Sequence, residues 1–193
     1  MSDLVVIIGP PAAGKAAVGL ALSQRTGFRF FHNHMTAEPA AALFGWGTQA
    51  MAEASSEMRL ALLTKALAQP NMPSIVFTFV WAFDHPADNY FVEKLVALFE
   101  SQRQKVFFVE LTASLQARIA REGTPLRLSL KPGKHDVVRA KAFHLEADGK
   151  HSMNSRGDFP YPDRHIVINT ESQSPAESAA LIVEHFGFAH AAS

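Results

Sequence analysis

The chain has 193 residues, enough for one domain with a buried core, and 48% of them are hydrophobic. Its 18 lysines and arginines balance 18 aspartates and glutamates, which gives no support to a nucleic-acid-binding or anionic membrane surface. Cysteine is absent, which excludes disulfides and thiolate sites. The run Leu4–Ile8 is too short for a signal peptide or a membrane span. We therefore expect a single cytoplasmic domain over residues 1–193, with no nucleic-acid or membrane partner.

Short apolar runs rich in β-branched or aromatic residues alternate with longer helical patterns along the chain. Such continuous runs are typical of strands buried on both faces of a parallel sheet. The five predicted strands are Leu4–Ile8, Phe28–Phe31, Ser74–Trp81, Lys105–Leu111 and His165–Ile168.

The segments between these runs are predicted to be helical. The first helix ends before Gly27, a suitable C-cap, and the last follows Ser174, which can cap it, with Pro175 in its first turn. The predicted helices are Lys15–Thr26, Met35–Ala68 with an interruption near residues 44–47, Pro86–Gln102, Ser114–Arg121, Asp136–Ala147 and Pro175–Phe186. Strand–helix alternation over the whole length predicts a three-layer α/β fold.

A phosphate-binding motif, G-x-x-x-x-G-K, lies between the first predicted strand and the first helix. Its small residues allow backbone N–H groups to turn inward around phosphate oxygens, and the helix N-terminus adds unpaired donors. Lys15 can then reach the terminal phosphates. The predicted nucleotide-binding residues are Gly9, Pro10, Pro11, Ala12, Ala13, Gly14, Lys15, Ala16 and Ala17.

One position departs from the motif, because the residue after Lys15 usually carries a hydroxyl that binds Mg²⁺. Here it is Ala16, and Ala17 follows. Mg²⁺ would have to be held through water, by another residue, or weakly. Asp84, just after the third predicted strand, is the candidate for a water-mediated contact. A helix cap before Pro86 is an equally good interpretation of Asp84.

The loop Gly9-Pro10-Pro11-Ala12-Ala13-Gly14-Lys15 resembles that of small P-loop kinases of the nucleoside-monophosphate kinase and shikimate kinase group, including chloramphenicol-phosphotransferase-like proteins. This resemblance implies a P-loop NTPase fold, with a five-stranded parallel sheet of order 2-3-1-4-5. It also implies a lid at about residues 122–134. The segment 115–121 resembles the arginine-bearing helix that opens the lid, and residues 166–170 resemble the last strand and the loop that passes the adenine.

The resemblance also assigns roles to basic residues. Arg118, Arg121 and Arg127 are catalytic candidates beside Lys15, because guanidinium groups can meet two oxygens of a transferred phosphoryl group at once. A solvated helix face is the alternative for Arg118 and Arg121, and surface charge is the alternative for Arg127. Arg59 lies where these kinases often place an acceptor-binding arginine.

Residues after the second predicted strand are expected to face the acceptor, since ligands gather at the carboxyl ends of strands in α/β sheets. These residues are His32, Asn33 and His34. Shikimate kinase-like enzymes usually place an aspartate here, and this chain has none. A histidine can accept a proton near neutral pH, although packing or capping is an equally good explanation. Trp81 is a further candidate for an apolar acceptor pocket, and a buried strand face is the simpler interpretation.

Together these features predict an ATP-dependent kinase that transfers a phosphoryl group to a small-molecule acceptor, with ATP and Mg²⁺ as cofactors and a monomeric or homodimeric state. Two alternatives stay open. The missing hydroxyl and aspartate favour a nucleotide-binding protein without transfer activity, and a nucleoside or nucleotide kinase would need a more basic acceptor side. A nucleotide hydrolase is disfavoured, because the third strand ends without a metal-binding carboxylate.

Overall fold

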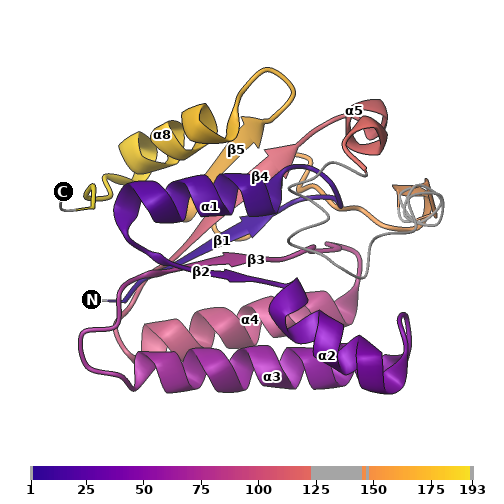
Figure 1. Ribbon diagram of the computed structural model, residues 1–193, viewed down its shortest axis with the longest axis horizontal. Helices are drawn as coiled ribbons and strands as arrows, with labels where there is room; N and C mark the ends of the chain where they lie inside the picture. The colour runs from indigo at the N-terminus through magenta and orange to yellow at the C-terminus, as the bar shows by residue number, and fades with distance from the viewer. Residues whose placement is uncertain (1, 123–144, 147, 192–193) are drawn as a thin grey trace.

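The computed structural model describes residues 2–122, 145–146 and 148–191. Five parallel strands form one sheet of order β2-β3-β1-β4-β5, as the resemblance implied (Figure 1). The strands are β1 Leu4–Ile8, β2 Arg29–His32, β3 Ile75–Thr78, β4 Val106–Thr112 and β5 His165–Asn169. All five predicted strands are therefore present, each within a few residues of its expected bounds.

The register of the sheet determines which residues lie at its carboxyl edge. Ile7 pairs with Thr78 of β3, and Ile8 pairs with Glu110 of β4. Strand β3 ends at Thr78, three residues earlier than expected, although the Phe79 N–H still donates to the carbonyl of Ile7 at 3.0 Å. The chain then leaves the sheet, so residues 79–85 form an irregular segment at this edge.

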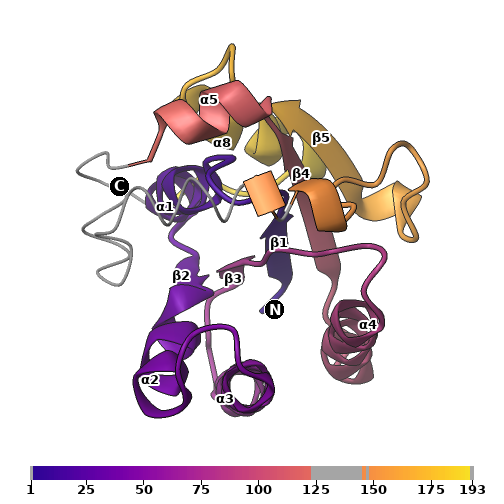
Figure 2. The ribbon, with the colours of Figure 1, turned by 90° about the vertical axis from the view of Figure 1, so that its right-hand side faces the viewer.

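Helices cover both faces of the sheet (Figure 1). On one face lie α1 Lys15–Thr26 and α8 Pro175–Phe186, and on the other α2 His34–Phe44, α3 Gln49–Leu67 and α4 Pro86–Ser101. The short α5 Leu115–Ala120 lies at the carboxyl edge, and a 3-10 turn, η2 Pro162–Arg164, precedes β5 (Figure 2). Most of the predicted lid and of the predicted helix Asp136–Ala147 lies outside the described residues. None of the helices described is both long and apolar enough to cross a membrane.

The helix ends follow local chemistry. Gly27 caps α1 in the left-handed conformation, with φ of 75°, and Ser174 forms a capping box with Glu177 at the start of α8, so both predicted caps are confirmed. The cap suggested for Asp84 is wrong. The residue before α4 is His85, which makes no side-chain cap, and the Asp84 carboxylate instead accepts from the Ser152 N–H at 2.9 Å.

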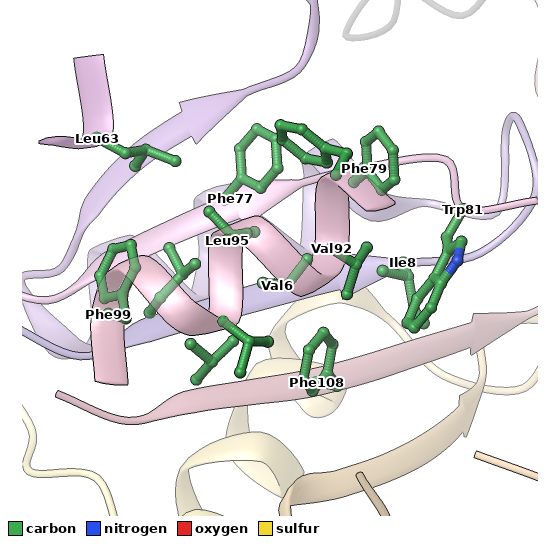
Figure 3. Packing of buried hydrophobic residues seen from close by; sticks show 14 of the residues in the cluster. Val6, Ile8, Leu63, Phe77, Phe79, Trp81, Val92, Leu95, Phe99 and Phe108 are labelled. Atoms are coloured by element: carbon green, nitrogen blue, oxygen red, sulfur yellow. The ribbon is translucent and has the colours of Figure 1, made fainter. Parts of the chain in front are cut away.

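Two apolar clusters hold the three layers together. One packs the sheet against α1 and α8, and the other packs it against α3 and α4 (Figure 3). The second cluster contains the alternating aromatic side chains of the β3 segment. Phe77, Phe79 and Trp81 are buried and Phe83 is partly buried, so their predicted burial is confirmed. Their assignment to one strand face is wrong beyond Phe77, because β3 ends at Thr78.

Leucine-to-alanine substitutions test this division between core and surface. Leu95 is fully buried on α4, whereas Leu62 on α3 is 51% exposed. Leu95→Ala is expected to lower the free energy of unfolding by about 2–5 kcal/mol, because it removes buried methyl groups and leaves a cavity. Leu62→Ala is expected to change it by less than about 0.5 kcal/mol. Urea denaturation checks both values, and equal effects of the two substitutions would contradict the packing.

Candidate functional site

The loop between β1 and α1 takes up a conformation that suits an anion. Gly9 has φ of 130°, and a Cβ placed there would lie 2.3 Å from the carbonyl oxygen of Leu111 on β4. Gly14 has φ of 98°, and Ala12 has φ of 60°, which is uncommon for a residue with a side chain. Positive φ angles of this kind occur in loops that turn backbone N–H groups towards an anion, although Pro10 and Pro11 have no N–H and the Ala13 N–H donates to the Pro10 carbonyl at 3.2 Å.

Side chains hydrogen-bond to the carbonyl oxygens of five successive loop residues, 9–13. The Lys15 ammonium donates to the first two at 2.7 Å each. Arg118 and Arg121 donate to the third and fourth, both at 3.4 Å, and the Thr170 hydroxyl donates to the fifth at 2.9 Å. Three cationic groups therefore gather around one loop, where a polyphosphate could replace carbonyl oxygens as their partner.

Helix α5 delivers both arginines to the loop because they are three residues apart and share a helix face. Arg118 is buried and also pairs with Asp148, from the segment that follows the predicted lid. Arg121 donates to the carbonyl and the hydroxyl of Thr170, at 2.7 and 3.0 Å. Both side chains thus lie beside the loop and are not part of a solvated face. Arg127 lies outside the described residues.

The residues after β2 form the start of α2. His32 is buried at the end of the strand. The N–H of Asn33 donates to the Thr78 hydroxyl of β3 at 3.2 Å, which ties this turn to the carboxyl edge of the sheet. His34 lies 3.1 Å from the Glu38 carboxylate, and its ring centroid lies 5.8 Å from that of Trp46.

Arg59 on α3 is buried in a network of hydroxyl groups. Its guanidinium donates to Thr36 at 3.2 Å and to Ser55 at 2.7 Å, and the two hydroxyls lie 3.0 Å apart. It also lies 5.6 Å from the ring centroid of Phe79 and 5.4 Å from that of Phe91. Thr36 and Ser55 were not among the sequence-predicted residues, and their link to Arg59 depends on the packing of α2 against α3.

Asp88, in the first turn of α4, carries a negative charge that acts on Arg59. Burial lowers the pKa of Arg59 to about 10, and the negative charge of Asp88 partly offsets this shift. Burial raises the pKa of Asp88, whereas the Ala82 N–H and the charges of Arg59 and histidines lower it. Sequence reasoning missed Asp88, because an acid in the first turn of a helix is usually explained by the helix dipole.

At the positions that usually bind Mg²⁺ beside such a loop, the described residues carry no suitable ligand. Ala16 and Ala17 lack a hydroxyl, and β3 ends at Thr78 without a carboxylate. No group of three or more potential ligands that could hold a metal occurs within the described part of the chain. Asp84 lies 3.5 Å from His151 and is bound to the Ser152 N–H, and its water-mediated role stays a prediction.

Trp81 belongs to the core more than to a pocket wall. It is 3% exposed, its indole N–H donates to Asn89 at 2.7 Å, and its ring stacks on Phe83 with centroids 4.4 Å apart. Phe159, from the segment before β5, packs edge-on against the same ring. The indole therefore helps to fix residues 79–85 at the edge of the sheet.

Glu110 binds the segment around Asn154 and Ser155, which lies between the predicted lid and β5 and is called the returning segment below. One of its oxygens accepts from the Asn154 side chain at 2.8 Å and from the Ser155 N–H at 2.9 Å, and the other lies 3.0 Å from Nε2 of His165. Burial alone would raise the pKa of Glu110, but these partners lower it to about 2, from an ordinary value of 4.5. These residues are far apart in sequence and meet only in the fold, so no sequence pattern predicted this cluster.

Solved structures share this fold across nearly the whole chain. A gluconokinase from Sinorhizobium meliloti 1021 is 16% identical, with 96% of this chain and 91% of that chain covered, at a TM-score of 0.60. The Mycobacterium tuberculosis APS kinase in complex with AMPPNP and APS is 15% identical (96% and 98% covered, TM-score 0.61). The Acinetobacter baumannii shikimate kinase in complex with shikimate is 14% identical (96% and 96%, TM-score 0.56). At these identities the likeness shows the fold.

Comparisons of sequence add nothing to this likeness. No protein-family model and no curated protein matches the chain. The fold is that of small P-loop kinases, and its activity has to be argued from the site.

Gly9→Ala tests the close approach of the loop to β4. The added Cβ would meet a backbone oxygen, so the loop must shift, and we expect ATP to lose its stabilising effect on Tm. Gly47→Ala is the matched control, because Gly47 also has a positive φ, 81°, but a Cβ there meets no atom of the described structure within 4 Å. Its strain of about 1 kcal/mol should leave the ATP effect intact. An unchanged ATP effect in Gly9→Ala would contradict the loop geometry.

Glu110→Gln tests the anchor of the returning segment. The folded-state pKa of about 2 lies below the ordinary 4.5, so the carboxylate stabilises the fold above about pH 4.5, and this contribution is lost as the pH falls towards about 2. The variant is expected to be less stable than the wild type at pH 7, with a difference that shrinks below about pH 5. Urea denaturation over this range checks it. Glu184→Gln, an exposed change on α8, is the control for the loss of a carboxylate and should change the free energy of unfolding at pH 7 by less than about 0.5 kcal/mol.

Proposed function

We propose that this protein is an ATP-dependent kinase that phosphorylates a hydroxyl group of a small molecule. The observation that carries the proposal is the gathering of Lys15, Arg118 and Arg121 on the carbonyl side of one phosphate-type loop. A site that only had to hold a nucleotide needs the loop and Lys15. Two further guanidiniums at the same place suit the charge that spreads over a phosphoryl group during transfer.

The proposed reaction is one displacement at the γ-phosphorus. The acceptor oxygen forms a bond to this atom as the bond to the β,γ-bridging oxygen breaks, so that ADP leaves and the acceptor loses its proton. Loop amides and Lys15 would hold the β- and γ-phosphates, and the α5 arginines would stabilise the transferred group. Asp148 would release Arg118 when the phosphates offer it stronger partners.

The acceptor would bind on the other side of the loop, between the start of α2, Arg59 and the segment 79–85. The solved structures with this fold include kinases named for gluconate, shikimate and APS, which are all small molecules. His32, Asn33 and His34 would line this side, and a buried cation at Arg59 would favour an acceptor that carries an anionic group.

A nucleotide-binding protein without transfer activity is the second candidate. The absence of a hydroxyl at Ala16 and Ala17 and of an aspartate among residues 32–34 favours it. The two candidate functions both require ATP to bind, and they differ in whether ATP is converted to ADP. Binding of ATP without formation of ADP, with any acceptor and with MgATP supplied, would support this second candidate.

The direct test follows ADP formation from MgATP with gluconate, shikimate and APS as acceptors, and identifies phosphorylated product by mass spectrometry. We expect one acceptor class to be phosphorylated. Arg121→Ala should then lower kcat by about 10³-fold, because it removes a charge that acts on the transition state. Arg25→Ala, an exposed change at the far end of α1, should leave kcat unchanged. Equal kcat for both variants would contradict the role of Arg121.

A further inference from the structure

Asp88 stands out as a carboxylate that the fold holds at the acceptor side of the loop. It lies in the first turn of α4, and α4 begins at the same edge of the sheet as the loop. This follows from the register, since β3 lies beside β1 and the Phe79 N–H donates to the carbonyl of Ile7, two residues before Gly9. The burial of Phe91 and Leu95 fixes the helix that carries Asp88.

The two oxygens of Asp88 differ in their surroundings. Oδ2 accepts from the Ala82 N–H at 2.9 Å, which orients the carboxyl group. Oδ1 has no hydrogen-bond partner among the described residues, and it is not among the buried polar atoms that lack one. One oxygen is therefore anchored, while the other can accept a hydrogen bond from a ligand.

Three side chains that can carry a positive charge lower the pKa of Asp88, and they come from different parts of the chain. Arg59 lies on α3, His85 precedes α4, and His151 belongs to the segment that follows the predicted lid. Their charges favour the carboxylate, whereas burial opposes it and raises its pKa on balance. A carboxylate whose pKa is raised by burial is a better proton acceptor than an exposed one.

We propose that Asp88 is the catalytic residue that binds the acceptor hydroxyl and takes its proton. Asp88 would take the role that shikimate kinase-like enzymes usually give to an aspartate after β2, since this chain has no aspartate there. As the acceptor oxygen bonds to the γ-phosphorus, its proton passes to Oδ1 of Asp88, and the electron pair of the broken bond leaves with ADP. The positive charge of Arg59 would favour the carboxylate form of Asp88 before the acceptor arrives. This inference rests on the kinase activity proposed above.

Asp88→Asn isolates this role, because the amide keeps an oxygen that can accept from the Ala82 N–H but cannot take a proton. With MgATP and the best acceptor among gluconate, shikimate and APS, we expect kcat to fall by about 10²–10⁴-fold. The increase in Tm caused by ATP should be retained. The wild type should lose activity at low pH, as Asp88 becomes protonated. The residual activity of the variant should lack this dependence on pH. Asp88→Glu, which restores a carboxylate, should recover part of the rate.

Asp163→Asn is the matched control, since Asp163 is an exposed aspartate in η2. It should keep the wild-type rate and pH profile. A kcat for Asp88→Asn within about threefold of the wild type would overturn the role of Asp88 while leaving the kinase proposal intact. If the wild type forms no ADP with any of these acceptors, the kinase proposal fails, and the role of Asp88 fails with it.

Discussion

The shape of the loop from Gly9 to Lys15 depends on side chains that reach it from three parts of the chain. Lys15 comes from α1, the arginines come from α5, and Thr170 follows β5. Each donates to a loop carbonyl, which holds the carbonyls on the side of the cations. Gly9 in turn lies against the backbone of β4, where no side chain fits. These contacts place the loop at the carboxyl edge of the sheet, where we propose that it binds the phosphates of ATP.

Much of this arrangement could be predicted from local patterns. The apolar runs and the caps at Gly27 and Ser174 depend on neighbours in sequence, and they predicted the strands and the helices. The spacing of the loop predicted a nucleotide site that stays a prediction. Strand order came from the resemblance alone, because the same strands could pair in other orders. The end of β3 was misplaced because residues 79–81 are as apolar as a strand, although they leave the sheet to pack in the core.

The buried polar groups on the side where we propose that the acceptor binds were less predictable, because they meet only through packing between distant segments. Arg59 depends on Thr36 and Ser55 from neighbouring helices, and Glu110 depends on Asn154 and His165. The role proposed for Asp88 depends on Arg59 and Ala82, which lie on other segments. In the sequence, Asp88 looks like any acidic residue in the first turn of a helix. Buried polar groups of this kind must find partners wherever the fold provides them, so single-sequence patterns carry little trace of them.

Nucleotide binding at the loop is the claim on which the other proposals rest. The most direct measurement is Tm with and without ATP for the wild type, Lys15→Ala and Lys65→Ala, where Lys65 is an exposed lysine on α3. Binding to the folded state must raise Tm by mass action. We expect ATP to raise the Tm of the wild type and of Lys65→Ala, and to leave the Tm of Lys15→Ala unchanged. A wild type whose Tm does not respond to ATP, or an equal rise in all three proteins, would contradict nucleotide binding at the loop.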